Sequence, residues 1–422
     1  MLDMNRYQWT VLFAAWLGWG FDCFDGLLFN YVAPNCVPTL LGLPLKSPEA
    51  VAATSQWVGI LTSVLLIGWA AGGILFGRIA DRIGRARTLL LTMALYSVGT
   101  ALCALAPNIW VLLLCRVIAA LGIGGEWAAG ASMVAEVVPE KRRVEAGALL
   151  YTAAPLGLFL ATFVTFQISH EWLGDSPSTS WRYVFLCGLI PAAVAFLVRL
   201  FIKEPERWAA IAARTKPPEI RELFSPAMRR STYSGLLMAI TALLMWWSIN
   251  AFIPKVAVDL AKVAGANAEN WKRIATNSFN AGGLIGTLLT VPLSKVLGRK
   301  AMFGIYFAAS AVAIMATFGL DLSGENRLYM YFFIGLTVFG VFGSFTYYLP
   351  ELFPTRLRGT GAGFCYNIGR VIAAAGPFFV GSVSARGLQT ELQVLFWVGV
   401  VPLLGLLAMP LVVETRDGVL AD

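Results

Sequence analysis

The sequence predicts an all-α integral membrane protein with twelve transmembrane helices, arranged as two six-helix bundles that repeat one another. Three observations predict this fold class: an apolar composition, a series of helix-length apolar runs, and two motifs that recur at one interval. Of the 422 residues, 58% are hydrophobic and 13% are charged, and the mean hydropathy is +0.71. A soluble domain carries about 25% charged residues, so this chain has too little polar surface to be a soluble globular protein.

The apolar runs are long enough to cross a bilayer, which requires about 20 mostly apolar residues in a helix. We expect helices at 9–32, 56–79, 88–106, 109–137, 143–168, 181–202, 231–254, 271–294, 301–320, 328–350, 359–383 and 392–413. A charged stretch with prolines at 205, 217 and 218 separates the sixth run from the seventh. The predicted organisation is therefore an N-terminal bundle (1–202), a cytoplasmic linker (203–230) and a C-terminal bundle (231–422).

The positive charges predict the orientation. Most of the 32 Lys and Arg residues fall in one alternate set of loops, including the linker. Cytoplasmic loops carry such an excess, so both termini should be cytoplasmic, in a cell membrane and most simply a bacterial inner membrane. The net charge of +8 does not indicate nucleic-acid binding, because the basic residues are dispersed between apolar runs. We expect the lipid bilayer around the chain, no nucleic-acid partner and a monomer.

Two motifs recur in the two halves. Glu136-x-x-Pro-x-x-x-Arg143 matches Glu351-x-x-Pro-x-x-x-Arg358, and the Gly84-Arg85 pair matches Gly298-Arg299 at nearly the same interval. Duplication of a six-helix unit in one orientation accounts for both matches. The second copy differs at one charged position, because Lys295 stands where the first copy has Asp81.

The loop Gly77-x-x-x-Asp81-Arg82-x-Gly84-Arg85-x-Arg87 resembles the signature loop of the major facilitator superfamily. The resemblance implies a cytoplasmic gate in which charged side chains hold the two halves together. The gate residues that it implies, with their counterparts in the second half, are Gly77, Asp81, Arg82, Gly84, Arg85, Glu136, Arg143, Arg299, Glu351 and Arg358.

Further motifs are similar to particular branches of that superfamily. Arg116 followed by Gly122-x-Gly124 is similar to the sugar porter pattern. Gly20-Phe-Asp22-x-x-Asp25 and Gly369-Arg370 resemble the aromatic acid, sialate and monocarboxylate proton symporters, and Gly124-Gly-Glu126-Trp127 resembles the metabolite and sialate symporters. These resemblances imply proton-coupled uptake of a small organic acid.

Few charges lie inside the predicted helices, and each costs roughly 2.5 to 3.5 kcal/mol at a helix centre. Asp22 and Asp25 are three residues apart, so both carboxylates lie on one helix face. Asp25 and Arg116 fall at similar depths, and we expect a pair that breaks when Asp25 is protonated. The alternative is a permanent structural salt bridge. The predicted proton-coupling residues are Asp25, Asp22, Arg116 and Glu126.

Arg370 falls near the middle of the eleventh predicted helix, at the depth where such folds bind substrate. A guanidinium holds a carboxylate through two parallel hydrogen bonds, so Arg370 indicates an anionic substrate. The alternative is that Arg370 permanently neutralises Asp22 or Glu126. Four polar residues are further substrate-binding candidates, and Trp246 with Trp247 could stack on a ring. The four are Asn250, Asn280, Tyr347 and Asn367.

Other functions remain as alternatives: a porter or facilitator for sugars or other neutral solutes, an exporter, or a receptor that does not transport. An enzyme is not expected, because a single histidine cannot build the usual metal or nucleophile site. No phosphate-binding loop of the ATP-dependent pumps is present in the sequence, and no metal or other cofactor is expected. The expected partners are a small-molecule substrate, with a carboxylate preferred, and protons.

Overall fold

The structure is a computed structural model that describes residues 4–45, 47–83, 85–139, 142–189, 193–194, 197, 219–354 and 357–416. Within this part the side chains of 77, 78, 80–83, 85, 86, 89, 125–133, 135 and 136 are not described. Most of the linker predicted at 203–230 therefore lies outside the described residues. Eight described helical segments are each long and apolar enough to cross a membrane.

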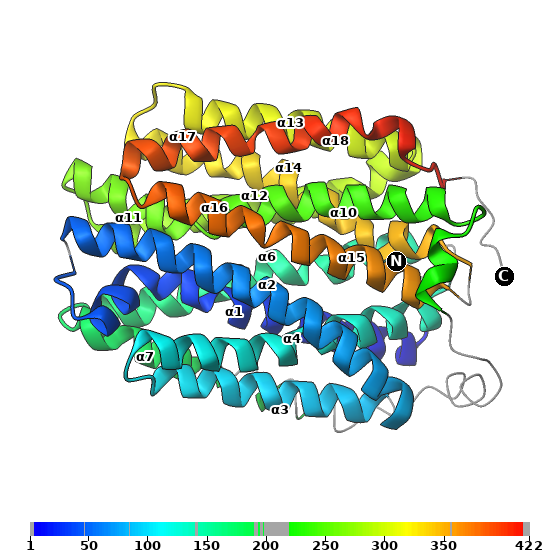
Figure 1. Ribbon diagram of the computed structural model, residues 1–422, viewed down its shortest axis with the longest axis horizontal. Coiled ribbons are helices and arrows are strands. Elements are labelled where there is room, and N and C mark those ends of the chain that lie inside the picture. The colour runs from blue at the N-terminus through cyan, green and yellow to red at the C-terminus, as the bar shows by residue number, and fades with distance from the viewer. Residues whose placement is uncertain are drawn as a thin grey trace.

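The described helices form twelve successive crossings of one elongated bundle, which confirms the predicted all-α fold (Figure 1). The first four crossings are α1 (Arg6–Leu41), α2 (Pro48–Ile83), α3 (Arg85–Ala104) and α4 (Ile109–Val137). The fifth consists of α5 (Arg143–Tyr151), α6 (Ala153–Phe166) and the π-helical turn η2 (Gln167–Trp172), and the sixth contains α7 (Pro177–Cys187). The short turn η3 (Ile220–Phe224) precedes the second half. The seventh crossing consists of α10 (Arg229–Asn250) and α11 (Ile253–Ala264), and the next three are α12 (Ala268–Val296), α13 (Arg299–Gly319) and α14 (Gly324–Glu351). The eleventh consists of α15 (Arg358–Ala373) and α16 (Ala375–Ser384), and the twelfth of α17 (Leu388–Val398), α18 (Val400–Leu407) and the turn η4 (Met409–Leu411).

The two halves repeat one packing pattern. In the first half α2 packs on α4, α3 on α4 and α1 on α6; in the second half α12 packs on α14, α13 on α14 and α10 on α15. Glycines allow the closest of these contacts. A Cβ atom on Gly72 would lie 2.1 Å from the Leu121 carbonyl oxygen, and one on Gly282 would lie 1.9 Å from that of Phe332. Small residues let helices approach this closely inside a membrane.

Four crossings are interrupted, and each interruption has a proline as its cause. Helices α5, α10, α15 and α17 end at Tyr151, Asn250, Ala373 and Val398, each four residues before a proline at 155, 254, 377 or 402. Proline has no N–H to donate to the carbonyl four residues earlier, so the helical ladder loses that bond. The crossings predicted at 143–168, 231–254, 359–383 and 392–413 are each present as one apolar span, and the structure adds a local break within each.

The first predicted helix was too short. Its predicted end at residue 32 lies before Pro34, but α1 continues through Pro34 and Pro38 to Leu41. It ends at Gly42, whose φ of 68° is left-handed and whose N–H bonds back to the carbonyls of Pro38 and Thr39. The described neighbours of this segment bury it, and a helix packed inside a membrane protein tolerates proline because neighbouring groups support the backbone.

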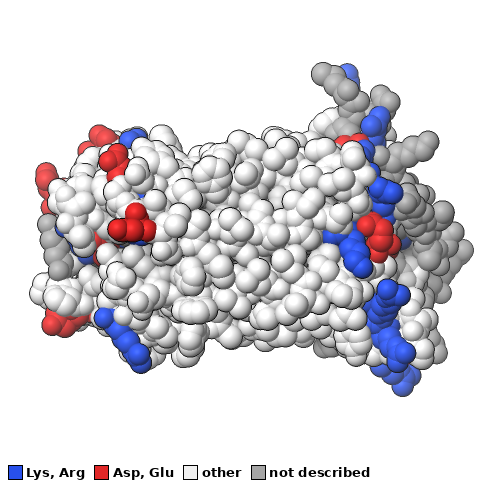
Figure 2. Space-filling model, turned by 90° about the horizontal axis from the view of Figure 1, so that it is seen from above, with Lys and Arg blue, Asp and Glu red and all other residues white. Residues whose placement is uncertain are grey.

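Charged side chains gather at the two ends of the bundle, and the surface between the ends is uncharged (Figure 2). One end is mainly blue in the figure, and we call it the basic end. It carries Arg142, Arg143, Lys295, Arg299, Lys300 and Arg416 around the starts of α5 and α13. The opposite end carries the turns that follow α1, α3, η2, α11, α13 and α16. The uncharged surface exposes large apolar side chains such as Phe163, Val312 and Phe379, as expected where lipid is the solvent.

Candidate functional site

Six aromatic rings form a closed belt in the middle of the molecule, and they come from both halves. Trp19, Trp69 and Tyr151 belong to the first half, and Trp247, Trp246 and Phe342 to the second. The order around the belt is Trp19, Trp69, Trp247, Trp246, Phe342 and Tyr151, which returns to Trp19. Neighbouring ring centroids lie 4.6 to 6.5 Å apart. Only two of these contacts join the halves: Trp69 to Trp247 at 5.5 Å and Tyr151 to Phe342 at 5.9 Å.

Arg370 lies beside this belt, and 1% of its surface is exposed. Its guanidinium carbon is 4.8 Å from the centroid of Trp69 and 4.5 Å from that of Tyr366. One guanidinium nitrogen donates to Oδ1 of Asn367 at 3.2 Å. Trp69 comes from α2 and the other three residues from α15, so this cation lies where the two halves meet. The aromatic faces stabilise the charge and hold the planar group in one orientation.

The predicted Asp25–Arg116 contact exists in a different form. Both side chains are buried, but the Arg116 guanidinium donates to the main-chain carbonyls of Asp25 at 3.2 Å and Gly26 at 2.5 Å. The Asp25 carboxylate accepts from the Thr100 hydroxyl at 2.6 Å. Arg116 therefore acts on the Asp25 carboxylate through its charge and by holding the main chain of α1. Asp22, which is fully buried one turn earlier, belongs to the same region of α1.

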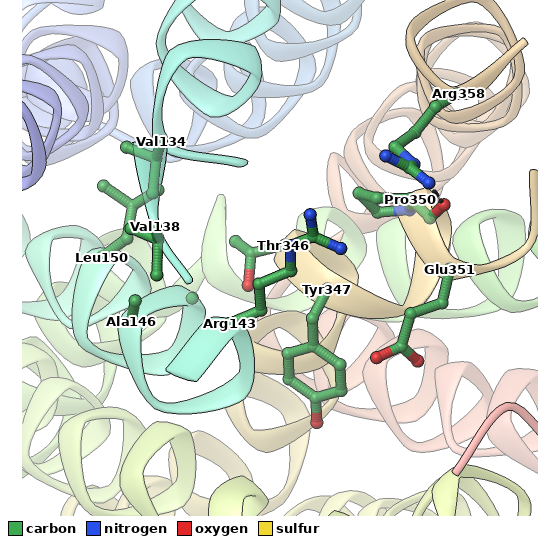
Figure 3. A pocket seen from close by; sticks show the side chains of 11 residues that line it. Val134, Val138, Arg143, Ala146, Leu150, Thr346, Tyr347, Pro350, Glu351 and Arg358 are labelled. Carbon is green, nitrogen blue, oxygen red and sulfur yellow. Dashed lines mark hydrogen bonds between the residues drawn. The ribbon is translucent and has the colours of Figure 1, made fainter. Parts of the chain in front are cut away.

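The remaining substrate-binding candidates lie in different places. Asn367 contacts Arg370, as described above. Asn280 on α12 is fully buried beside the Tyr31 phenol, and Asn250 lies at the end of α10, one turn after Trp246. Tyr347 is separate from the arginine site. It lies in the wall of a cavity at the basic end (Figure 3), with its ring 5.5 Å from the Arg299 guanidinium carbon. The Glu126 side chain lies outside the described residues.

Sequence reasoning missed a buried ionic cluster in the second half. Lys255 on α11 bonds to Glu391 on α17 at 2.5 Å and to Asp259 at 2.9 Å. Lys262, which is partly exposed, lies 3.4 Å from Asp259. The predicted helix at 231–254 ends just before Lys255. Pro254 was nevertheless a signal that a new helix begins there, because proline is common in the first turn of a helix. The cluster fixes α11, the outer part of the seventh crossing, to the start of the twelfth.

Removing one partner of this cluster should destabilise the protein more than replacing its three buried charges together. Glu391→Ala leaves the Lys255 charge buried without its nearest carboxylate, which costs roughly 3 to 5 kcal/mol. Lys255→Met combined with Asp259→Asn and Glu391→Leu should recover most of that loss, because the three buried charges are then gone. Thermal unfolding of the detergent-solubilised protein measures the difference, with the exposed Glu325→Ala as the control. Equal melting temperatures for Glu391→Ala and the wild type would contradict this assignment.

Comparison with known proteins identifies the family. The sequence model of the Major Facilitator Superfamily matches residues 15–377. The chain belongs to this superfamily. Members of it are membrane transporters, so the chain is a transporter and not an enzyme.

Individual relatives are similar over nearly the whole length. The sialic acid transporter NanX of Escherichia coli is 26% identical over 90% of this chain and 89% of its own. The gentisate transporter of Corynebacterium glutamicum is 26% identical over 96% of this chain and 88% of its own. A crystal structure of a D-xylose-proton symporter shares the superfamily fold, with a TM-score of 0.75, 19% identity and coverage of 97% of this chain and 99% of that one.

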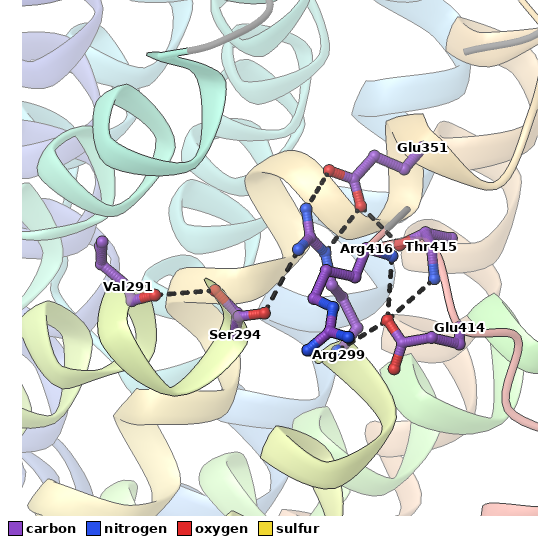
Figure 4. A network of polar contacts seen from close by, with 7 residues as sticks. All are labelled: Val291, Ser294, Arg299, Glu351, Glu414, Thr415 and Arg416. Carbon is purple, nitrogen blue, oxygen red and sulfur yellow. Dashed lines mark hydrogen bonds and ion pairs between the residues drawn. The ribbon is translucent and has the colours of Figure 1, made fainter. Parts of the chain in front are cut away.

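The cytoplasmic gate stays a prediction, and most of its described side chains belong to the second copy. Arg299 at the start of α13 pairs with Glu351 at the end of α14 through two contacts, of 3.1 and 2.7 Å, and donates to the Ser294 carbonyl (Figure 4). The Thr415 hydroxyl donates to the same carboxylate at 2.5 Å. Arg358 donates to the Pro350 carbonyl, and it lines the cavity of Figure 3 together with Arg143.

The chain's C-terminal segment completes this network. Glu414 accepts from the main-chain N–H group of Arg299 at 2.9 Å, at the start of α13 (Figure 4). It also accepts from the N–H group of Lys300 at 3.0 Å. Partial burial raises the pKa of this carboxyl, but N–H donors from Lys300, Arg299, Arg416 and Thr415 outweigh it and hold the pKa below its usual value. Of the predicted first-copy gate residues, only the Arg143 side chain is described. The side chains of Asp81, Arg82, Arg85 and Glu136 are not described, Gly77 is described only as part of the α2 backbone, and Gly84 lies outside the described residues.

Proposed function

We propose that this transporter takes up a small, planar organic acid together with protons, by alternating access between its two halves. The observation that carries the proposal is the buried Arg370 guanidinium, held between the Trp69 and Tyr366 rings at the junction of the halves. A carboxylate that binds such a planar cation gains two parallel, charge-assisted hydrogen bonds. A solute bound there contacts both halves and can therefore follow their relative movement.

The aromatic belt supports a planar substrate. A ring next to Arg370 would meet the faces or edges of Trp69, Trp247 and Tyr151, which favour flat, apolar partners. The names of two relatives are consistent with an acid, since sialic acid and gentisate both carry a carboxylate.

Polar atoms on α10 and α12 support a second polar group on the substrate. The Trp246 indole N–H and the Asn250 amide nitrogen are buried without a hydrogen-bond partner among the described residues. The Asn280 amide lies beside the Tyr31 hydroxyl. Trp246 and Asn250 are four residues apart and so share one face of α10. A buried donor without a partner costs about 1 to 3 kcal/mol, which a hydroxyl, carbonyl or ring nitrogen of the substrate would recover. These same atoms favour the second candidate, a porter for sugars or other neutral solutes.

For the coupling of transport to protons we propose Asp25, with Asp22, Arg116 and Glu126 as supporting groups. Asp25 is 1% exposed and accepts one described hydrogen bond, from Thr100. Protonation of this carboxylate would change its attraction to Arg116 and thereby the position of α1. This second role is separate from the anion site, because Arg116 and Arg370 lie on different helices in different halves.

For the orientation we propose that the basic end faces the cytoplasm of a bacterial cell, since lysine and arginine concentrate there (Figure 2). Uptake then runs from the opposite end towards the basic end. A reporter enzyme fused after Arg358 should be active in the cytoplasm, and one fused after Lys262 should be active outside. The reverse result would invert the proposed direction.

The test of the proposed function is uptake into proteoliposomes with an acidic exterior. The panel contains benzoate-like ring acids with and without a hydroxyl group, a sialate, lactate, a dicarboxylate and a neutral sugar. We expect concentrative uptake of a ring acid that collapses when a protonophore removes the pH gradient. Uptake of the sugar alone would support the second candidate, and downhill flux without accumulation would identify a facilitator.

A further inference from the structure

Helix α12 reaches from the second half to the first half at both of its ends. At the basic end, Lys295 forms an ion pair with Glu145 in the first turn of α5. At the opposite end, the Lys272 ammonium donates to the main-chain carbonyl oxygen of Tyr31 on α1 at 3.0 Å. Both lysines are on one helix, near its two termini, and both partners belong to the N-terminal half.

The contact at the basic end lies next to a point where α5 of the first half and α14 of the second half pack closely. A Cβ atom on Gly147 of α5 would lie 2.4 Å from the Thr346 hydroxyl of α14, so these two helices touch with no space between them. The ion pair is partly exposed, with 43% of the Lys295 side chain and 21% of the Glu145 side chain accessible. Arg142 lies 3.6 Å from the same carboxylate. Water can replace such a pair readily, so it is suited to repeated opening.

The contact at the opposite end is of another kind. The Lys272 side chain is 4% exposed and is neutralised by Glu269 of its own helix at 2.6 Å. One turn further along α12, Thr276 meets the Thr162 hydroxyl of α6 at 3.1 Å, which is a second polar contact between the halves. A buried ammonium that donates to a carbonyl is more costly to separate than an exposed ion pair.

We propose that α12 is a two-ended latch, in which Lys295–Glu145 closes the basic end and Lys272–Tyr31 closes the opposite end. The structure has both contacts formed at once. Opening towards either side breaks one contact and leaves the other in place, so the two contacts set the balance between the two open states. The latch goes beyond the proposed function, because it does not depend on which solute is carried.

The two contacts predict opposite effects of substitution. Glu145→Gln should increase the population open at the basic end by about 1.5- to 5-fold, the range for a partly exposed ion pair. Lys272→Met, combined with Glu269→Gln to keep the site neutral, should increase the population open at the opposite end by about 10- to 150-fold, the range for a hydrogen bond to a buried charge.

Distances between spin labels in the full-length protein, measured in nanodiscs without substrate, test the latch. Labels at the exposed positions Arg87 and Leu297 report on the basic end, and labels at Asp175 and Glu325 on the opposite end. Lys300→Gln and Arg386→Gln are the controls, because these basic side chains lie at the same two ends without a described contact to the first half.

The decisive variant exchanges the charges of the exposed pair. Lys295→Glu combined with Glu145→Lys should restore the wild-type distance at the basic end, while each single substitution should lengthen it. If the double variant stays open, or if the Lys272 variant opens the basic end instead, the latch is overturned. Because no substrate is present, failure of the latch leaves the organic-acid proposal standing, and failure of the uptake panel leaves the latch standing.

Discussion

Replacing Arg370 with alanine is expected to nearly eliminate substrate binding. A two-bond contact between a guanidinium and a carboxylate in a buried site loses roughly 2 to 5 kcal/mol on truncation, because the carboxylate is left buried without its partner. This corresponds to a loss in affinity of about 30-fold to several thousand-fold. Equilibrium binding of the acid identified by the uptake panel, measured by calorimetry on the purified protein, provides the test.

Arg370→Lys is the informative second variant. It keeps the charge but loses the planar fork and its stacking between Trp69 and Tyr366, which are 4.8 and 4.5 Å from the guanidinium carbon. It should therefore recover only part of the affinity. Arg273→Ala is the control, since Arg273 is an exposed arginine over Phe166 at the opposite end, and it should bind as the wild type does.

A neutral ester of the substrate separates an anion-binding role from a structural one. The ester should bind poorly to the wild type and lose little more affinity in Arg370→Ala, because it never makes the carboxylate contact. If the acid and the ester weaken equally in the variant, Arg370 supports the fold of the site and the case for an organic acid fails.

The Asp25→Asn variant is expected to lose acid-driven accumulation and keep substrate exchange. The amide resembles the protonated carboxylate in shape and charge, so the carrier can still change state with substrate bound but can no longer release a proton. Counterflow of labelled substrate in proteoliposomes, compared with uptake driven by a pH gradient, measures the two activities separately.

Asp321→Asn is the matched control for this substitution, because Asp321 is exposed at the opposite end. It should leave both activities intact. Accumulation that persists in Asp25→Asn would transfer the coupling role to Asp22 or Glu126. If Asp25→Asn loses both exchange and accumulation, the hydrogen bond from Thr100 to the Asp25 carboxylate, at 2.6 Å, is needed to keep the site assembled.

Much of the candidate site could be anticipated because a charge inside a membrane helix is conspicuous in a sequence. Asp22, Asp25, Arg116 and Arg370 were selected for this reason and for the motifs around them, and all four are at most 2% exposed. Their partners could not be anticipated in the same way. Trp69 is far from Arg370 along the chain, and only the packing of α2 against α15 places its ring beside the guanidinium.

Tyr366 is an exception, since a sequence signal was available for it. It precedes Arg370 by four residues, which places the two on one helix face. Tyr347, whose substrate-binding role stays a prediction, lies apart from Arg370. Its residue type and its place inside a predicted helix suggested a substrate contact, but depth along α14 and the rotation of that helix place it beneath Arg299 at the basic end.

The sequence by itself determined the twelve crossings, the duplication of the halves and the concentration of positive charge at one end. These features depend on hydropathy and on backbone bonds between residues close in the chain. Only the tertiary structure decided that Arg116 holds main-chain carbonyls of α1, that Lys255 meets Glu391, and that Lys295 meets Glu145. Contacts between helices depend on the rotation and axial shift of each helix, which are set by the packing of many small and aromatic side chains together.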